Sequence, residues 1–204
     1  MIKNKKIILV VSIISLLIIM LSTVSNASAS AKAFGNSQSG YANNSVGYAI
    51  YGLDLLGYSV TGSSGQITKA DMLDWINNTG NGYGMYVHTY GGSGYFNDYY
   101  GYSINSSMIS GNWDLVYIDS SYSGATNSLA YAFNTIGYAS RCFLGWSNAV
   151  TTANSNSFNY YFWTDYVGGT TIQSAAVSAA SCVPGSGTTP IKLYGSSTYD
   201  GTAR

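Results

Sequence analysis

Apolar residues recur at helical spacing in several segments, and short apolar runs alternate with these segments along the chain. In Ser45–Leu56 the residues Val46, Ala49 and Leu53 fall on one face, and Gly57 follows as a stop, which predicts a helix. Thr68 with Asp71 three residues later is typical of the start of a second helix. The same patterns predict helices over 68–80, 125–137, 155–167 and 171–182, and strands over 58–62, 83–92, 113–119, 140–147 and 190–195.

The strand expected at 113–119, "WDLVYID", is apolar along nearly its whole length rather than alternating. Such a run fits a parallel strand that is covered on both faces. Strands that alternate with helices indicate an α/β layer fold with a mainly parallel sheet. No repeat of fixed period and no linker divides the chain, so we expect a single domain.

The N-terminus has the features of an export signal. Lys3, Lys5 and Lys6 precede an apolar run, Ile7–Leu21, and the small-residue stretch "SNASASA" follows. Cleavage after Ala29 or Ala31 fits this pattern; with Ala31 as the boundary, 1–31 is the signal peptide and 32–204 the domain. The alternative is an uncleaved membrane anchor, although the run is shorter than the ~20 residues that a spanning helix needs. We therefore expect a secreted or cell-surface protein.

Few charges remain once the three leader lysines are set aside. Five Lys and Arg stand against eight Asp, and there is no Glu. No basic patch supports nucleic-acid binding. The surface must be built largely from Ser, Thr, Asn, Gly and Tyr. Tyrosines could stack on a cell-wall glycan, and Tyr160, Tyr161 and Trp163 are candidates, but the alternative is that these three are simply the packed and partly exposed faces of one helix.

Two strand ends carry reactive residue types. The only histidine, His88, ends one strand, and Asp119, Ser120 and Ser121 end another. Ligands gather at the carboxyl ends of parallel strands, so neighbouring strands would make His88 and Ser121 a base and nucleophile. The alternative is a hydrogen-bonded histidine beside ordinary turn serines. The sequence has no P-loop, HExxH, CxxC or GxSxG motif, and one histidine excludes an imidazole-rich metal site. We expect no metal and no cofactor.

The two cysteines, Cys142 and Cys182, have two interpretations. In an exported protein a pair indicates one disulfide. Alternatively, they are two buried thiols that act as small apolar residues, and Cys142 lies within a predicted buried strand.

Taken in order, "YVHTYGG", "LVYIDSSYSG", "LAYAFNTIGYASRCFLGWSNAV" and "FNYYFWTDYV" resemble the caspase-like (clan CD) cysteine peptidases, with bacterial gingipain-like and metacaspase-like domains as the nearest kin. The resemblance covers about 45–167 and implies a three-layer sandwich with helices on both faces of the sheet. It implies that His88 is the general base and that Ser121 occupies the position of the nucleophilic cysteine. By the same resemblance, Asp119 helps to hold a substrate Lys or Arg, and Gly91, Gly92 and Gly124 lie in turns whose N–H groups face the oxyanion.

The chain departs from the family pattern in three places. Thr89 rather than glycine follows the histidine, the family's first strand is missing or reduced to "KAFG", and serine replaces cysteine at 121. A serine does not ionise beforehand as a thiol does, and it needs a third group to orient its histidine. The sequence offers no carboxylate close to His88, and Asp98 would have to fold back to reach it.

These departures lead to an ordered set of functions. The first expectation is an exported caspase-like pseudopeptidase that keeps a cleft for a peptide or protein ligand. The first alternative is an active hydrolase, through Ser121 and His88 or family-type chemistry, with a preference for basic residues. The second alternative is a cell-wall or glycan-associated structural module.

Overall fold

The computed structural model describes residues 29–77, 81–166, 170–183 and 191–200. Its main element is a six-stranded sheet in the order β2-β1-β3-β7-β8-β9. Within the described part of the chain the first five of these strands are parallel and β9 runs antiparallel to β8. The strands span Ser30–Asn36 (β1), Ser59–Gly65 (β2), Asn81–His88 (β3), Asn112–Asp119 (β7), Cys142–Trp146 (β8) and Ile191–Gly195 (β9).

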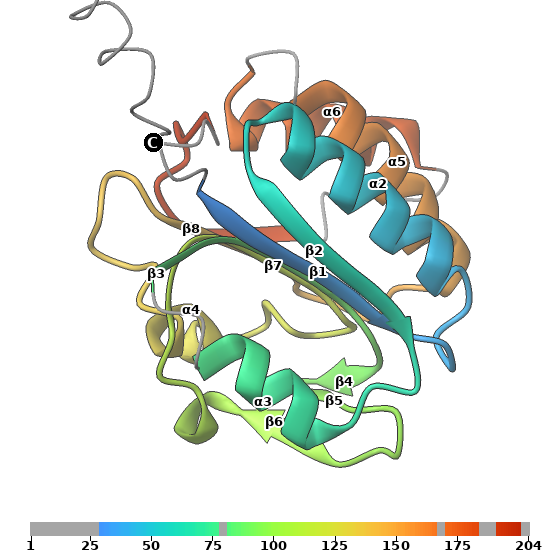
Figure 1. The fold of residues 1–204 in the computed structure, drawn as a ribbon. Helices are drawn as coiled ribbons and strands as arrows, with labels where there is room; N and C mark the ends of the chain where they lie inside the picture. The colour runs from blue at the N-terminus through green and yellow to red at the C-terminus, as the bar shows by residue number, and fades with distance from the viewer. Residues whose placement is uncertain (1–28, 78–80, 167–169, 184–190, 201–204) are drawn as a thin grey trace, which may run out of the picture.

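Helices cover both faces of this sheet, as Figure 1 shows. One face packs against three helices, α2 (Ala42–Leu55), α5 (Thr152–Tyr166) and α6 (Ile172–Cys182). The other packs against α3 (Lys69–Asn77), the short α4 (Ser128–Ala132) and a small sheet of β4 (Gly91–Gly92), β5 (Tyr95–Asn97) and β6 (Ser103–Asn105), which the 3-10 turn η1 (Ser106–Met108) follows. The expected α/β fold, with a mainly parallel sheet between helices, is confirmed.

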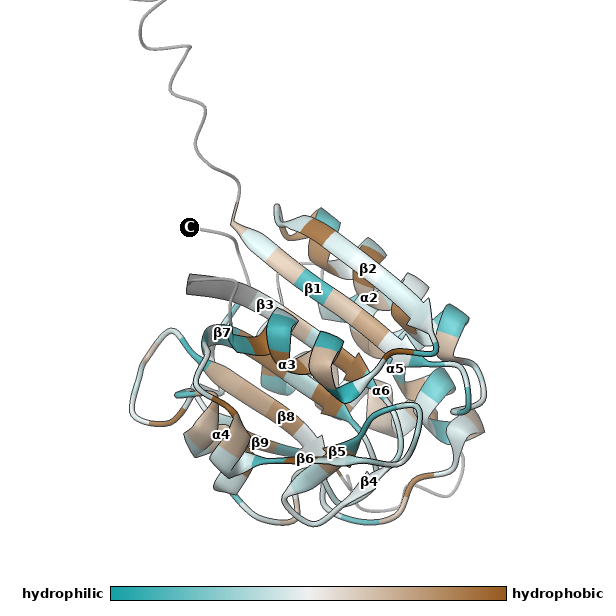
Figure 2. Ribbon diagram, turned by 60° about the horizontal axis from the view of Figure 1, so that its bottom comes forward, coloured by the Kyte–Doolittle hydropathy of each residue, from teal (hydrophilic) through white to brown (hydrophobic). Residues whose placement is uncertain are grey.

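The central strands form the apolar middle of the molecule. In β7, Leu115, Tyr117 and Val116 are fully buried, and alternate residues contact opposite cores. Figure 2 shows β7 and β8 as largely hydrophobic and β2, at the sheet edge, as mostly pale. Parallel strands buried on both faces produce this continuous apolar pattern, which is why the sequence of β7 could be recognised.

The first strand is neither missing nor limited to "KAFG": β1 contains those four residues and extends from Ser30 to Asn36. β1 lies inside the sheet, paired with β2 on one side and β3 on the other. Its small residues have a packing reason: Ala31 and Ala33 are fully buried, and a Cβ on Gly35 would lie 2.9 Å from Val46 Cγ2 and 3.3 Å from His88 Cβ. Small side chains let α2 approach the sheet closely at this point.

The boundary placed at Ala31 divides this strand. Ala31 pairs with Val60 and Gly84, and the carbonyl of Ala29 accepts a hydrogen bond from the Ser59 N–H at 2.8 Å. A cut after Ala31 would therefore remove the first two residues of β1. Of the two cleavage sites that the sequence allows, the one after Ala29 leaves β1 entire. No helix in the described ranges is both long and apolar enough to cross a membrane.

The helix expected over 125–137 is much shorter in the structure. α4 ends at Ala132, and Asn134 adopts a left-handed conformation with φ 56°. Thr135 then closes the turn, because both its N–H and its hydroxyl donate to the Ala130 carbonyl, at 3.0 and 2.9 Å. Thr and Asn side chains compete with helical hydrogen bonds in this way. By contrast, Thr68 and Asp71 form the expected reciprocal cap, with the Asp71 N–H on Thr68 Oγ1 at 3.2 Å and the Thr68 N–H on Asp71 Oδ2 at 3.2 Å.

Candidate functional site

The two strand ends singled out in the sequence lie next to each other. β3 and β7 are parallel neighbours, and His88 is in register with Asp119. A small pocket at this carboxyl edge is lined by both residues together with Ser39, Thr89, Tyr90, Ser120, Ser121, Val150, Thr152 and Ser155. The site therefore combines the ends of β3 and β7, the turn between β1 and α2, and the first turns of α5.

His88 and Asp119 form a buried ion pair, with 2.6 Å between Nδ1 and Oδ2. Each residue is only 2 % exposed. Burial by itself would raise the pKa of Asp119, but the His88 charge and hydrogen bonds from His88, Ser155 and Asn159 outweigh it and lower the pKa to about 2. The carboxylate therefore stays ionised, and it fixes the orientation of the imidazole ring.

Several further donors surround the Asp119 carboxylate. Tyr86 Oη donates at 2.8 Å and Trp146 Nε1 at 2.7 Å, from the neighbouring strands. Ser155 Oγ and Asn159 Nδ2, one helical turn apart on α5, each lie 2.7 Å from Oδ2. A carboxylate with this many donors is held rigidly and is satisfied without a substrate cation.

This environment changes the role expected for Asp119. The family resemblance gives it a substrate Lys or Arg, but its side chain is fully buried and its oxygens are occupied by groups of the chain itself. Asp119 supplies the carboxylate that the sequence did not offer to His88. Asp98 does not fold back: it accepts from the N–H groups of Lys69, Tyr100 and Tyr102 at 2.7–2.9 Å, and so closes its own loop.

The other ring nitrogen of His88 contacts the turn after β1. Nε2 lies 2.7 Å from Ser39 Oγ and 3.2 Å from the Gly40 carbonyl. Burial alone would lower the pKa of His88, but the charge and hydrogen bond of Asp119 and the Gly40 carbonyl raise it above the ordinary value of 6.5. Ser39 was not singled out in the sequence. Ser39 lies in the turn after β1, and β1 pairs with β3. Only a correct prediction of β1 as the neighbour of β3 would have brought Ser39 close to His88.

Ser121 lies at the same pocket but binds a different partner. Its Oγ accepts from the Val150 N–H at 3.1 Å and donates to the Val150 carbonyl at 3.3 Å. Between these two described residues, Ser121 and His88, there is no hydrogen bond. Next to it, the buried Ser120 hydroxyl has no hydrogen-bond partner. The four serines of the pocket thus have different partners: Ser39 contacts His88, Ser155 donates to Asp119, Ser121 is bonded to Val150, and Ser120 has none.

The three glycines that were expected to face an oxyanion make other contacts in the structure. Gly124 donates its N–H to the Trp146 carbonyl at 2.9 Å, so this group is already used. Gly91 and Gly92 form the short strand β4 rather than a turn, and a Cβ on Gly91 would collide with the Ser120 hydroxyl. Thr89, which replaces the family glycine, turns its hydroxyl to the Asn97 carbonyl at 2.6 Å.

The structure contains no disulfide between Cys142 and Cys182. Cys142 is buried at the start of β8, where burial raises its pKa well above the usual value, whereas Cys182 is exposed at the end of α6. The interpretation as buried thiols is therefore confirmed for Cys142 and wrong for Cys182, and the expected disulfide is absent.

The aromatic residues considered for a glycan surface divide between core and solvent. Trp163 is 1 % exposed and packs in the core, while Tyr160 and Tyr161 lie on the solvent side of α5, 48 % and 37 % exposed. They are thus the packed and exposed faces of one helix, as one of the two interpretations states.

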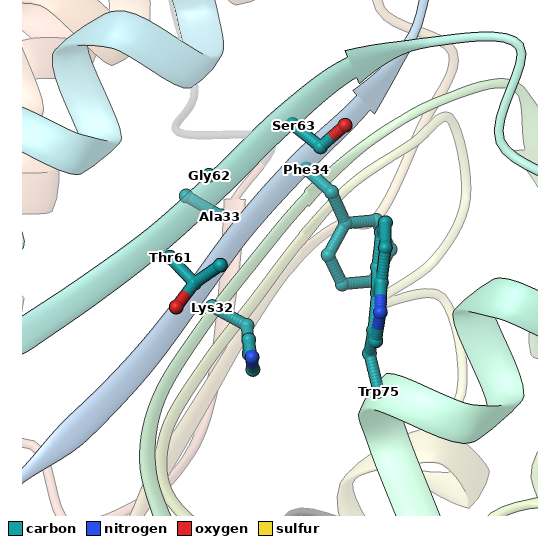
Figure 3. Close-up of a pocket in the computed structure, with 7 residues that line it drawn as sticks. All are labelled: Lys32, Ala33, Phe34, Thr61, Gly62, Ser63 and Trp75. Carbon is teal, nitrogen blue, oxygen red and sulfur yellow. The ribbon is translucent and has the colours of Figure 1, made fainter.

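A second pocket lies on the α3 side of β1 and β2, away from the ion pair (Figure 3). Trp75 of α3 stands edge-on to Phe34, with 5.2 Å between the ring centroids, and Lys32, Thr61 and Ser63 line the remainder. Both pockets are small, about 20 Å³ each, which is room for about one water molecule. The second one holds no nucleophile and base pair, so the carboxyl edge is the stronger candidate. No protein-family model matches the chain, and no curated protein gives a significant match.

Proposed function

We propose that this chain is an exported caspase-like domain that has lost the peptidase chemistry of its nucleophile position and keeps a binding cleft for a peptide or protein segment. The mainly parallel sheet with helices on both faces supports the family part of the proposal, because the resemblance implies that architecture. The meeting of His88 and Ser121 at one pocket supports it further, since the family places its base and nucleophile at such an edge.

One observation carries the loss of peptidase chemistry. The Ser121 hydroxyl both donates to the Val150 carbonyl and accepts from the Val150 N–H. His88 Nε2, which would have to accept the Ser121 proton, contacts Ser39 and Gly40 instead. A serine without a hydrogen-bonded base keeps its proton and is a weak nucleophile. Activating Ser121 would require breaking two hydrogen bonds and moving the imidazole or the serine.

Exposed tyrosines around the pocket support the binding part. Tyr90 lines the pocket, Tyr41 follows Gly40 and Tyr122 follows Ser121, and these three side chains are 49, 51 and 42 % exposed. Tyr41 and Tyr122 have φ values of 65° and 62°, a conformation that costs energy in a residue other than glycine. Strained, exposed aromatic residues beside a pocket fit a surface that packs against a ligand chain.

The test compares peptide cleavage and peptide binding in one set of samples. The purified chain and the Ser121→Ala and Ser121→Cys variants are incubated with a library of short peptides that contain Lys or Arg, and a Ser178→Ala variant, on the solvent side of α6, is the matched control. We expect no cleavage by the chain, the control or Ser121→Ala, and retention of a subset of peptides in a binding assay. If only Ser121→Cys cleaves peptides, residue 121 occupies the position of the lost nucleophile.

Two outcomes contradict the proposal. Cleavage by the unmodified chain that Ser121→Ala abolishes would show that Ser121 is a working nucleophile. Absence of both cleavage and peptide retention, in folded protein, would remove the peptide cleft.

A further inference from the structure

Ser39 stands where a strand turns into a helix. β1 ends at Asn36 and α2 begins at Ala42, and between them Tyr41 takes the left-handed conformation, with φ 65°. Hydrolases of the α/β class also present a nucleophilic serine between a strand and a helix at the carboxyl edge of the sheet, although there the serine itself is the strained residue, whereas here it is Tyr41. The chain builds this turn without the G-x-S-x-G motif.

The imidazole joins Ser39 to a carboxylate. Ser39 Oγ lies 2.7 Å from His88 Nε2, and His88 Nδ1 lies 2.6 Å from Asp119 Oδ2. In the neutral imidazole Nδ1–H donates to Asp119, so that Nε2 is the acceptor for the Ser39 O–H. In the protonated imidazole Nε2–H donates instead to the Gly40 carbonyl at 3.2 Å or to Ser39. Serine, histidine and aspartate in this order meet the geometric description of a catalytic triad.

The surroundings of Ser39 fit a reacting hydroxyl. Ser39 is 2 % exposed, and the pocket that reaches it also contains the unpartnered hydroxyl of Ser120, a spare hydrogen-bond donor in a buried place. A buried donor without a partner is costly and points to a polar atom that is to be bound there. The pocket is small, about 20 Å³ with room for about one water molecule, so only the smallest acyl groups are candidates for it.

We propose that Ser39 is the nucleophile of an acyl-transfer site, with His88 as general base and Asp119 as its positioning residue, and that its substrates are esters of short acyl groups such as acetate. This inference concerns a different hydroxyl from the proposal about Ser121, and it does not depend on the caspase-like assignment.

The reaction balances with the groups present. Ser39 Oγ forms a bond to the ester carbonyl carbon while its proton passes to His88 Nε2. The carbon–oxygen bond to the alcohol then breaks, and Nε2–H gives its proton to the departing alkoxide, which leaves acyl-Ser39. Water enters, loses a proton to Nε2 and attacks the acyl carbon, and Ser39 Oγ departs with that proton. The Ser120 hydroxyl, which lines the pocket, would donate a hydrogen bond to the negatively charged oxygen.

The experiment measures p-nitrophenyl acetate hydrolysis and maps a fluorophosphonate label by mass spectrometry. Ser39→Ala is expected to lower kcat/KM by about 10²- to 10⁴-fold, as the loss of a nucleophile or base does. Ser37→Ala, an exposed serine in the same turn, is the matched control and is expected to keep the activity. The label is expected on the peptide that contains Ser39, and Ser39→Ala is expected not to be labelled.

The outcomes separate this inference from the proposed function. If neither Ser39 nor Ser121 is labelled, and Ser39→Ala hydrolyses the ester as fast as the unmodified chain, the inference is overturned. The pseudopeptidase proposal would then still stand. A label on Ser121 would overturn both. If circular dichroism shows that Ser39→Ala does not fold, the position of the label on the unmodified chain decides, together with Ser39→Cys, which keeps a hydrogen-bonding nucleophile and is expected to react with iodoacetamide at 39.

Discussion

Replacing Asp119 by asparagine removes the charge that holds His88 without removing the shape of the side chain. The carboxylate has a pKa of about 2 against 3.8 in an unfolded chain, which corresponds to roughly 2 kcal/mol of stability. Removing one partner of a buried pair costs about 3–5 kcal/mol when the other charge is left uncompensated. We therefore expect Asp119→Asn to lower the free energy of unfolding by about 2–5 kcal/mol near pH 5.5.

The pH dependence of this loss follows from the direction of both shifts. The lowered pKa of Asp119 contributes stability above 3.8 that disappears as the pH falls through about 2. The raised pKa of His88 contributes stability that is complete below 6.5 and disappears as the pH rises through its folded value. The ion pair is thus most stabilising between these limits, and the deficit of Asp119→Asn is expected to shrink above the His88 pKa.

Urea unfolding at several pH values measures the stability, and proton NMR measures the His88 pKa, because the chain has a single histidine and hence a single imidazole Cε1–H signal. Asp114→Asn is the matched control: Asp114 lies on the same strand and pairs with Arg141 at 3.2 Å, but both side chains are 22 % exposed. Its loss is expected to stay below about 1 kcal/mol and to leave the His88 pKa unchanged. An Asp119→Asn variant with the original His88 pKa, or with an equal deficit at all pH values, would refute the ion-pair reasoning.

Three further predictions test the packing and the ends of the fold. Gly124→Ala is expected to cost about 1–3 kcal/mol or more in thermal unfolding, because its Cβ would lie only 2.7 Å from the Gly145 carbonyl carbon, and full stability would contradict that close contact. One thiol, Cys182, is expected to react with a thiol reagent in the folded chain and a second only after denaturation, whereas a disulfide would give none in either state. On the proposal that the chain is exported, N-terminal sequencing of the secreted fraction is expected to start at Ser30. A chain starting at Lys32 is expected to lose about 1–3 kcal/mol with its strand pairings, so equal stability of the two would count against the boundary.

The helices and the central strands could be predicted because their patterns are strong. α2, α5, α6 and β7 were expected within a few residues of their observed bounds; periodic apolar residues and Gly57 mark α2, and a continuous apolar run marks β7. β1 was expected at most as the fragment "KAFG", because "SAKAFGN" has no β-branched residue. Its strand conformation comes from pairing on both sides and from the close approach of α2, which favours alanine and glycine there.

The sequence predicted where the candidate site lies, but not which side chains are hydrogen-bonded to each other there. That His88 and Asp119–Ser121 share one edge followed from the rule for parallel strands. Which of these residues meets the imidazole depends on side-chain direction: the register pairs His88 with Asp119 on one face, while Ser121 lies two residues beyond the strand. Ser39 depended on the strand that the sequence concealed, and the donors Ser155 and Asn159 depended on the docking of α5.

The edge strand of the sheet, β2, bears on whether copies of the chain associate with one another. All seven of its residues, "SVTGSSG", are at least partly exposed, none is charged or proline, and in the described sheet it pairs only with β1. Natural sheets protect such edges with lysine, proline or a covering segment, because unpaired N–H and C=O groups can add a further strand. On a surface with so few charges, electrostatic repulsion between molecules is weak. A high local concentration of the chain would therefore favour lateral association through β2.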